Sequence, residues 1–214
     1  MDLNFIPQVV ILVFSVVFHE VAHGYAALLR GDTTARDAGR LTLNPIPHID
    51  LFGTILLPLF LVLIHSPVLV GSAKPVPINP WRFKNPKKDM AITGAAGPAS
   101  NLFLAFCAAI LFRIVMQMSG PGNLMVHYLA YAVLINLVLA FFNLIPIPPL
   151  DGSRVVLIFL SNEQAAKYNR LERYGFFIVL ALLYLGLFRI LVLPPVIFFL
   201  KMLIGNAGLY VLGS

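Results

Sequence analysis

Long apolar runs separated by short polar loops make up most of the chain. A helix needs about 20 apolar residues, each adding roughly 1.5 Å, to cross a hydrocarbon core of about 30 Å. Apolar runs of about that length or longer occupy residues 5–29, 51–70, 90–116, 124–145 and 174–210. The pattern predicts an all-α polytopic membrane protein with about five to six membrane-embedded helical segments.

Two segments depart from a simple crossing. Residues 51–70 are apolar but contain glycine and two prolines, which favours a re-entrant element buried against protein. Residues 41–48, "LTLNPIPH", carry too many prolines to continue as helix, so we expect a short extended element there. The final apolar region, 174–210, is interrupted by Arg189, Pro194–Pro195 and Lys201.

Composition supports the membrane assignment. Hydrophobic residues make up 59% of the chain and charged residues 11%, with a mean hydropathy of +0.89. A soluble domain carries about 25% charged residues, so both a soluble globule and a disordered chain are excluded. The single cysteine, Cys107, excludes an internal disulfide framework and a cysteine-rich metal site.

In a membrane protein the positions of basic residues usually indicate topology, so we do not read the net charge of +6 as a sign of nucleic-acid binding. Basic residues gather in the loops 30–50, 71–90 and 161–173, whereas 118–123 carries no charge. These three loops share one side only if 51–70 dips in and returns. The positive-inside rule then places the N-terminus outside and the three loops in the cytoplasm.

The absence of internal repeats predicts one membrane domain over 1–214. We expect a catalytic core at about 5–160 and C-terminal membrane helices at about 173–212. The first apolar run lacks a basic n-region and a small-residue cleavage site, which favours a retained helix over a removed signal peptide.

The first apolar run contains the sequence His-Glu-Val-Ala-His at 19–23. Residues four apart share one face of a helix, so His19 and His23 can hold one Zn²⁺ between them. Glu20, beside the first ligand, is placed to take a proton from water. Ionisable groups inside an apolar span cost several kcal/mol unless satisfied, so the motif predicts a metal site rather than a chance match.

A catalytic zinc site needs a third protein ligand, and Asp151 is the strongest candidate. It follows "NLIPIPPL", a stiff proline-rich arm, and precedes Gly152. The alternative is that Asp151 caps a short helix over 153–160. The residues alone leave these two readings open. Three further histidines remain as ligand candidates: His48, His65 and His127. His48 and Asp50 form either a surface pair or a contact with the site.

Together these motifs resemble those of the site-2 protease family of intramembrane zinc metalloproteases. That family pairs a membrane-embedded HExxH with a downstream N-x-x-P-x-P-x-x-D-G, and both occur here as "HEVAHG" and "NLIPIPPLDG". The sequence "AGPASN" at 96–101 is similar to the glycine-proline-asparagine stretch between them. The likeness covers about residues 10–160 and suggests a short, minimal member without a PDZ domain.

The resemblance implies a zinc-dependent endopeptidase that cleaves membrane-spanning or membrane-associated proteins in the lipid bilayer. His19, His23 and Asp151 would then bind one Zn²⁺ per chain, Glu20 would be the general base, and Asn143 would lie near the site. For His23 and Asp151 to reach one ion, the spans 5–29 and 124–145 must run in the same direction. A minimal chain of this kind suits a prokaryotic inner membrane, with the active site towards the cytoplasm.

Two alternatives carry different functions. A catalytically silent scaffold of the same fold has no need of Glu20, and a metal-ion transporter would place ionisable residues along several spans.

A transmembrane substrate must unwind to be cleaved, and pairing with an extended edge is one way to hold it. The segments 39–45 and 74–80 are either such edges or plain connectors.

Overall fold

The computed structural model describes residues 5–56 and 73–213. These residues form helices and connecting loops, with no strand among them. The elements in chain order are α1 (Phe5–Leu29), α2 (Thr34–Asp37), η1 (Ile46–His48), η2 (Leu51–Leu56), η3 (Pro80–Arg82), α4 (Pro86–Ser119), α5 (Leu124–Asn143), α6 (Asp151–Val156), η4 (Leu157–Phe159), α7 (Asn162–Asn169), η5 (Arg170–Tyr174), α8 (Gly175–Tyr184), α9 (Leu187–Leu191) and α10 (Leu193–Gly213). The all-α prediction is confirmed.

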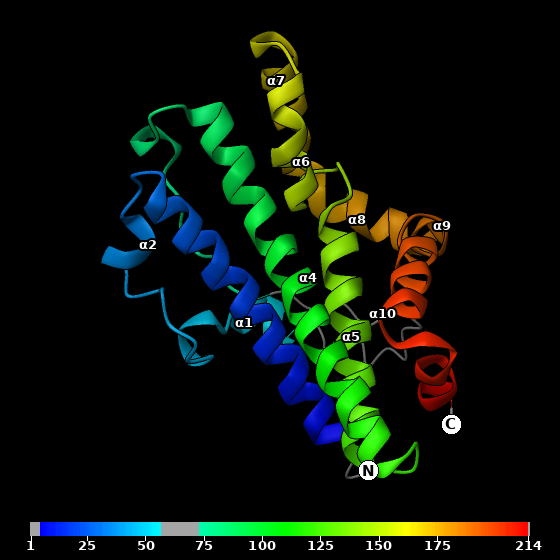
Figure 1. The fold of residues 1–214 in the computed structure, drawn as a ribbon. Coiled ribbons are helices and arrows are strands. Elements are labelled where there is room, and N and C mark those ends of the chain that lie inside the picture. The colour runs from blue at the N-terminus through cyan, green and yellow to red at the C-terminus, as the bar shows by residue number, and fades with distance from the viewer. Residues whose placement is uncertain (1–4, 57–72, 214) are drawn as a thin grey trace.

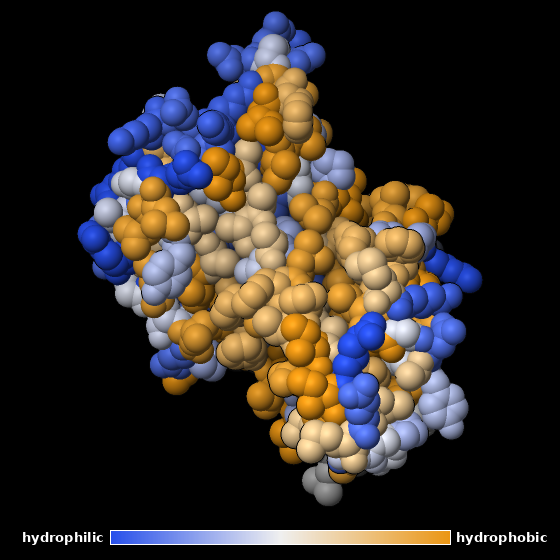
Figure 2. All heavy atoms as spheres, viewed as in Figure 1, coloured by the Kyte–Doolittle hydropathy of each residue, from blue (hydrophilic) through white to orange (hydrophobic). Residues whose placement is uncertain are grey.

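Four described helices, α1, α4, α5 and α10, are long and apolar enough to cross a membrane by length and composition. Hydrophobic atoms cover most of the middle of the molecule, and hydrophilic atoms cover the end that carries α2 and α7 (Figure 2). This distribution matches a protein whose middle lies in lipid and whose basic loops lie in water.

Helices α1, α4 and α5 pack side by side, and α10 packs on α5 (Figure 1). Figure 1 shows α1 and α5 running in one direction and α4 returning between them. This is the parallel arrangement that a shared metal requires of the spans 5–29 and 124–145. The buried core between α4, α5 and α10 is apolar and includes Phe112, Val126, Val133, Leu137, Val196 and Leu200.

Local signals explain where the helices begin and end. The Asn123 side chain accepts a hydrogen bond from the backbone N–H of Met125 at the start of α5. At the end of α4, Gly120 takes a positive φ of 73°, which an L side chain rarely adopts. Gly120 and Asn123, three residues apart, therefore mark the two ends of the turn between α4 and α5.

The predicted element at 41–48 lies within the described residues, and the one at 51–70 lies there only in part. Ile46–His48 forms a 3₁₀ turn, η1, so the expected extended element is wrong over these residues. Leu51–Leu56 forms a turn of π-helix, η2. Residues 57–70 lie outside the described residues, and the re-entrant arrangement stays a prediction.

Gly152 is required where α6 meets the end of α5. A Cβ at this position would overlap the backbone carbonyl of Leu144 and come within 2.6 Å of the carbonyl oxygen of Ile145. Backbone atoms cannot turn aside as a flexible side chain does. We expect Gly152→Ala to lower stability by about 1–3 kcal/mol, measured as thermal unfolding in detergent. Gly122→Ala, where the added Cβ meets nothing within 4 Å, is the control and should leave unfolding unchanged.

Candidate metal centre

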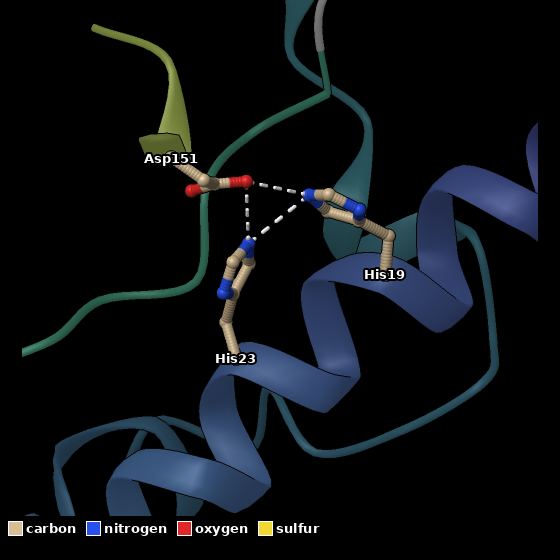
Figure 3. Close-up of side chains that lie close together, drawn as sticks. All are labelled: His19, His23 and Asp151. Carbon is tan, nitrogen blue, oxygen red and sulfur yellow. Dashed lines mark hydrogen bonds and ion pairs between the residues drawn. The ribbon is translucent and has the colours of Figure 1, made fainter. Parts of the chain in front are cut away.

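His19, His23 and Asp151 meet between α1 and the start of α6 (Figure 3). The Nε2 atoms of the two histidines lie 3.0 Å apart, and Asp151 Oδ2 lies 3.1 Å from each of them. All three side chains are buried. The structure therefore brings Asp151 to two histidines that lie 128 and 132 residues before it in the sequence, and each of the three side chains offers one atom that can ligate a metal ion.

Each ligand candidate is placed by local structure. His19 and His23 are four residues apart on α1 and so project from one face. Asp151 is the first residue of α6, whose N-cap is Leu150, and no side-chain hydrogen bond caps that helix. The alternative reading of Asp151 as the cap of a helix over 153–160 is therefore wrong, and its carboxylate turns instead to the two imidazoles.

The second nitrogen of each histidine has a defined partner. His19 Nδ1 lies 2.5 Å from Asn101 Oδ1, and His23 Nδ1 lies 2.7 Å from the backbone carbonyl of Thr93. Both oxygens accept hydrogen bonds, so both Nδ1 atoms carry the proton. A neutral imidazole protonated at Nδ1 has its lone pair on Nε2, the atom that faces Asp151.

The carboxylate completes a set of electron-rich atoms. A metal ion would bind this carboxylate in its ionised form, as it would bind the unprotonated Nε2 atoms of the two histidines. Two imidazole nitrogens and a carboxylate oxygen converging in a buried site form a donor set that suits Zn²⁺.

Helix α4 presses its glycine-rich stretch against this group. A Cβ at Gly97 would overlap the Nε2 atoms of both His19 and His23. Gly97 therefore leaves open the space in front of the converging ligand atoms. This opening supports the fit of a metal ion, because any larger residue would fill the place where the ligands meet.

Glu20 lies beside the ligands and is half-buried. Its Oε2 accepts a hydrogen bond of 2.9 Å from the backbone N–H of Val76. The surrounding segment is tied down as well, since Lys74 N–H donates to the His48 carbonyl and Asn79 N–H donates to Asp32 Oδ2. Because these backbone N–H groups already donate hydrogen bonds within the protein, they are not free to pair with a substrate strand. This favours the interpretation of 74–80 as a connector.

Within the described part of the chain, the side-chain hydrogen bonds of Asn143, His48 and Asp50 do not reach His19, His23 or Asp151. Asn143 ends α5, and its Nδ2 donates back to the carbonyl of Leu139. His48 is 2% exposed, so the surface-pair reading is wrong, and its Nε2 contacts the carbonyl of Thr42. Asp50 accepts a hydrogen bond from Gly53 N–H. His65 lies outside the described residues.

Sequence reasoning missed the polar partners of the histidines. Asn101 appeared only as the last residue of "AGPASN", with no role, and Asn136 was not singled out. Both are fully or almost fully buried and hydrogen-bonded to each other. The available signal was an amide side chain in an apolar span, which needs a partner inside the protein.

A sequence profile of Peptidase family M50 matches residues 113–186, which include Asp151. A protein of Bacillus subtilis (strain 168), provisionally named zinc metalloprotease YwhC, is 40% identical over 187 residues, 84% of this chain and 81% of the relative.

More distant relatives carry similar names. The provisionally named zinc metalloprotease Rip2 of Mycolicibacterium smegmatis is 29% identical over 173 residues, 79% of this chain and 63% of that protein. The provisionally named zinc metalloprotease MJ0611 of Methanocaldococcus jannaschii is 44% identical over 61 residues, 28% of this chain and 30% of its own. No solved structure matches the chain at a significant level. The extent and identity of the Bacillus match show that this chain belongs to peptidase family M50, the site-2 protease family.

Proposed function

We propose that the protein is a zinc-dependent endopeptidase that cleaves membrane-spanning or membrane-associated proteins within the bilayer. The observation that carries the proposal is the buried convergence of His19, His23 and Asp151, with both Nε2 lone pairs directed at the carboxylate. The position of the two histidines on a helix long enough to span a membrane supports an intramembrane site. The names of the relatives support zinc as the metal.

In this proposal His19, His23 and Asp151 would hold one Zn²⁺ per chain. Bound zinc supplies Lewis acidity, which lowers the pKa of water and polarises a peptide carbonyl. The surrounding protein contributes a dry, shaped site. Gly97 keeps the space before the ligands clear, and the partners of Nδ1 hold both imidazoles in one orientation.

Glu20 is the general base of the proposed reaction. Its carboxylate takes a proton from the attacking water and passes it to the nitrogen of the departing amine. The hydrogen bond from Val76 N–H to Oε2 holds the carboxylate in place while Oε1 remains to exchange the proton. Asn143, at the end of α5 on the approach to Asp151, is proposed to hold the substrate or stabilise the developing oxyanion.

The proposed side of the active site follows from the charges. Asp151 follows α5 at the end of the molecule where α2 and α7 lie, and Figure 2 shows hydrophilic atoms gathered there. The basic residues of the loops 30–50 and 161–173 favour a cytoplasmic position for that end by the positive-inside rule. We therefore propose a cell-membrane protein that cuts its substrates near the cytoplasmic face.

Comparing Glu20→Gln with His23→Ala tests this function. Glutamine keeps an oxygen that can accept the Val76 hydrogen bond but cannot take a proton, so Glu20→Gln should retain zinc and lose activity by at least about a hundredfold. His23→Ala should lose both. The measurements are zinc content of the detergent-purified protein and cleavage of a panel of single-span reporter proteins in liposomes.

The same pair of variants separates the other functions. A silent scaffold would show no cleavage by the wild type and no effect of Glu20→Gln on any binding partner. A transporter would move Zn²⁺ into liposomes, and would do so equally well after Glu20→Gln. Either result would contradict the proposed peptidase.

A further inference from the structure

The two histidines obtain their Nδ1 partners in different ways. His23 Nδ1 donates to the backbone carbonyl of Thr93, which can only accept a hydrogen bond. His19 Nδ1 instead faces the side-chain amide of Asn101. An amide rotated by half a turn would present its NH₂ group, which would favour a proton on the other ring nitrogen of His19. Something must therefore fix the direction of the Asn101 amide.

A buried chain of hydrogen bonds does so. Asn101 Nδ2 donates to Asn136 Oδ1 over 2.8 Å, and this places Asn101 Oδ1 towards His19. The Asn136 amide is oriented in turn by two acceptors, because its Nδ2 donates to the carbonyl of Ala132 and to Ser15 Oγ, each at 2.9 Å. The Ser15 hydroxyl donates its own hydrogen to the carbonyl of Ile11, so its oxygen is left to accept from Asn136.

Every link of this chain has one allowed direction. It begins at two backbone carbonyls, those of Ala132 and Ile11, which have no hydrogen to give. Reversing the Asn136 amide would set its oxygen against the Ala132 carbonyl and its NH₂ against that of Asn101. The direction therefore passes from the backbone through Asn136 and Asn101 to His19 Nδ1. The additional contact of Asn101 Nδ2 with the Ser15 carbonyl, at 3.4 Å, is long and weak by comparison.

Burial makes the chain effective. Asn101 is 0%, Ser15 1% and Asn136 3% exposed. With water excluded, a reversed amide has no solvent to satisfy it, so the cost of reversal is larger than at a surface. Packing alone gives no reason for two amides and a hydroxyl between three apolar helices.

We propose that Asn136 is a positioning residue of the metal centre, which acts through Asn101 to hold the His19 ring with Nε2 free to bind zinc. The proposal rests on the proposed zinc peptidase function. Asn136 touches neither metal nor substrate in this role. It gives His19, across one intervening side chain, the fixed acceptor that the Thr93 backbone gives His23 directly.

Asn136→Leu removes the acceptor while keeping a side chain of similar size. We expect the zinc affinity of the detergent-purified protein, measured by competition with a chelator, to fall by about tenfold, the lower end for loss of a partner of a metal-binding histidine. Asn136→Asp, protonated so that one oxygen still donates to the Ala132 carbonyl, keeps the other oxygen facing Asn101 and should retain most of the affinity. Val133→Ala, one turn earlier on α5 and also buried, tests whether any core defect has the same effect.

A second measurement reads the tautomer itself. Nitrogen-15 NMR of the zinc-free protein with labelled histidine should show His19 protonated at Nδ1 in the wild type. After Asn136→Leu it should show two neutral tautomers in exchange, one protonated at Nδ1 and the other at Nε2. His23 should not change, because its carbonyl partner is untouched. Asn136→Ser, too short to reach Asn101, keeps the test available if the leucine variant does not fold, and it should weaken zinc binding similarly.

The outcomes separate this proposal from the proposed function. Unchanged zinc affinity and an unchanged His19 tautomer after Asn136→Leu would overturn the positioning role and leave the zinc site standing. Equal losses in Asn136→Leu and Val133→Ala, with the His19 tautomer unchanged, would assign Asn136 to packing and also overturn it. A wild type that binds no zinc would contradict the proposed function, while the tautomer measurement would still decide the role of Asn136.

Discussion

Asp151→Ala is expected to remove zinc from the purified protein. Asp151 supplies the only charged atom among the three that converge, at 3.1 Å from both histidine nitrogens. Structural zinc sites with four protein ligands bind with about 10–16 kcal/mol, or about 2.5–4 kcal/mol per ligand, so losing one ligand should weaken the affinity by about a hundredfold to a thousandfold. Metal analysis after dialysis should find about one zinc per wild-type chain and almost none in the variant.

The matched control is Asp89→Ala. Asp89 is also a buried aspartate, 4% exposed against 8% for Asp151, and it accepts a hydrogen bond from the backbone N–H of Asn85. Its loss should lower stability without releasing zinc. Full retention of zinc by Asp151→Ala would show that another residue is the third ligand. His48 is a poor substitute, because its nitrogens are not among the ligand atoms that converge with those of His19 and His23.

Gly97→Ala should have an effect of similar size by a different route. The added methyl group would overlap the Nε2 atoms of His19 and His23. The cluster must then either exclude the metal or push α4 away from α1, and overpacking of this kind costs about 1–3 kcal/mol. We expect bound zinc to fall to less than about a tenth of the wild-type content, since the methyl group competes for the space that the ion needs.

Gly122→Ala is again the control, because its Cβ meets nothing within 4 Å. Thermal unfolding of the zinc-free proteins separates the two routes. A Gly97→Ala protein that is as stable as the wild type but free of zinc has its site filled. One that binds a full equivalent of zinc with normal affinity would contradict the close approach of α4 to the ligands.

The membrane helices and the first two candidate ligands were predictable because their signals are local. Hydrophobic run length predicts α1 at 5–29, and the structure has Phe5–Leu29. The i, i+4 spacing alone places His19 and His23 on one face of that helix. Asp151 required more, since the same Asp-Gly-Ser sequence also suits a helix cap. The resemblance to the site-2 protease family selected the ligand reading.

The surroundings of the site were not predictable, because they depend on which helices become neighbours. Nothing near Asn136 in the sequence indicates that it faces Asn101 on another helix. The hydrogen bond from Val76 to Glu20 joins residues 56 positions apart through a loop. The place of Gly97 against the ligands likewise follows from the packing of α4 on α1. A glycine in an apolar helix has several explanations until its neighbours are known.

The chain of hydrogen bonds from α5 through α4 to α1 has a thermodynamic consequence. The orientation of the His19 ring and the packing of the three helices are coupled, because the hydrogen bonds that orient His19 form only while α1, α4 and α5 are in contact. Coupling of this kind is reciprocal: an ion that binds the assembled bundle more tightly stabilises the assembly by the same free energy. The metal content would then report whether the three helices are packed together. A lipid or partner protein that separates α4 from α5 would lower the metal affinity without contacting the ion.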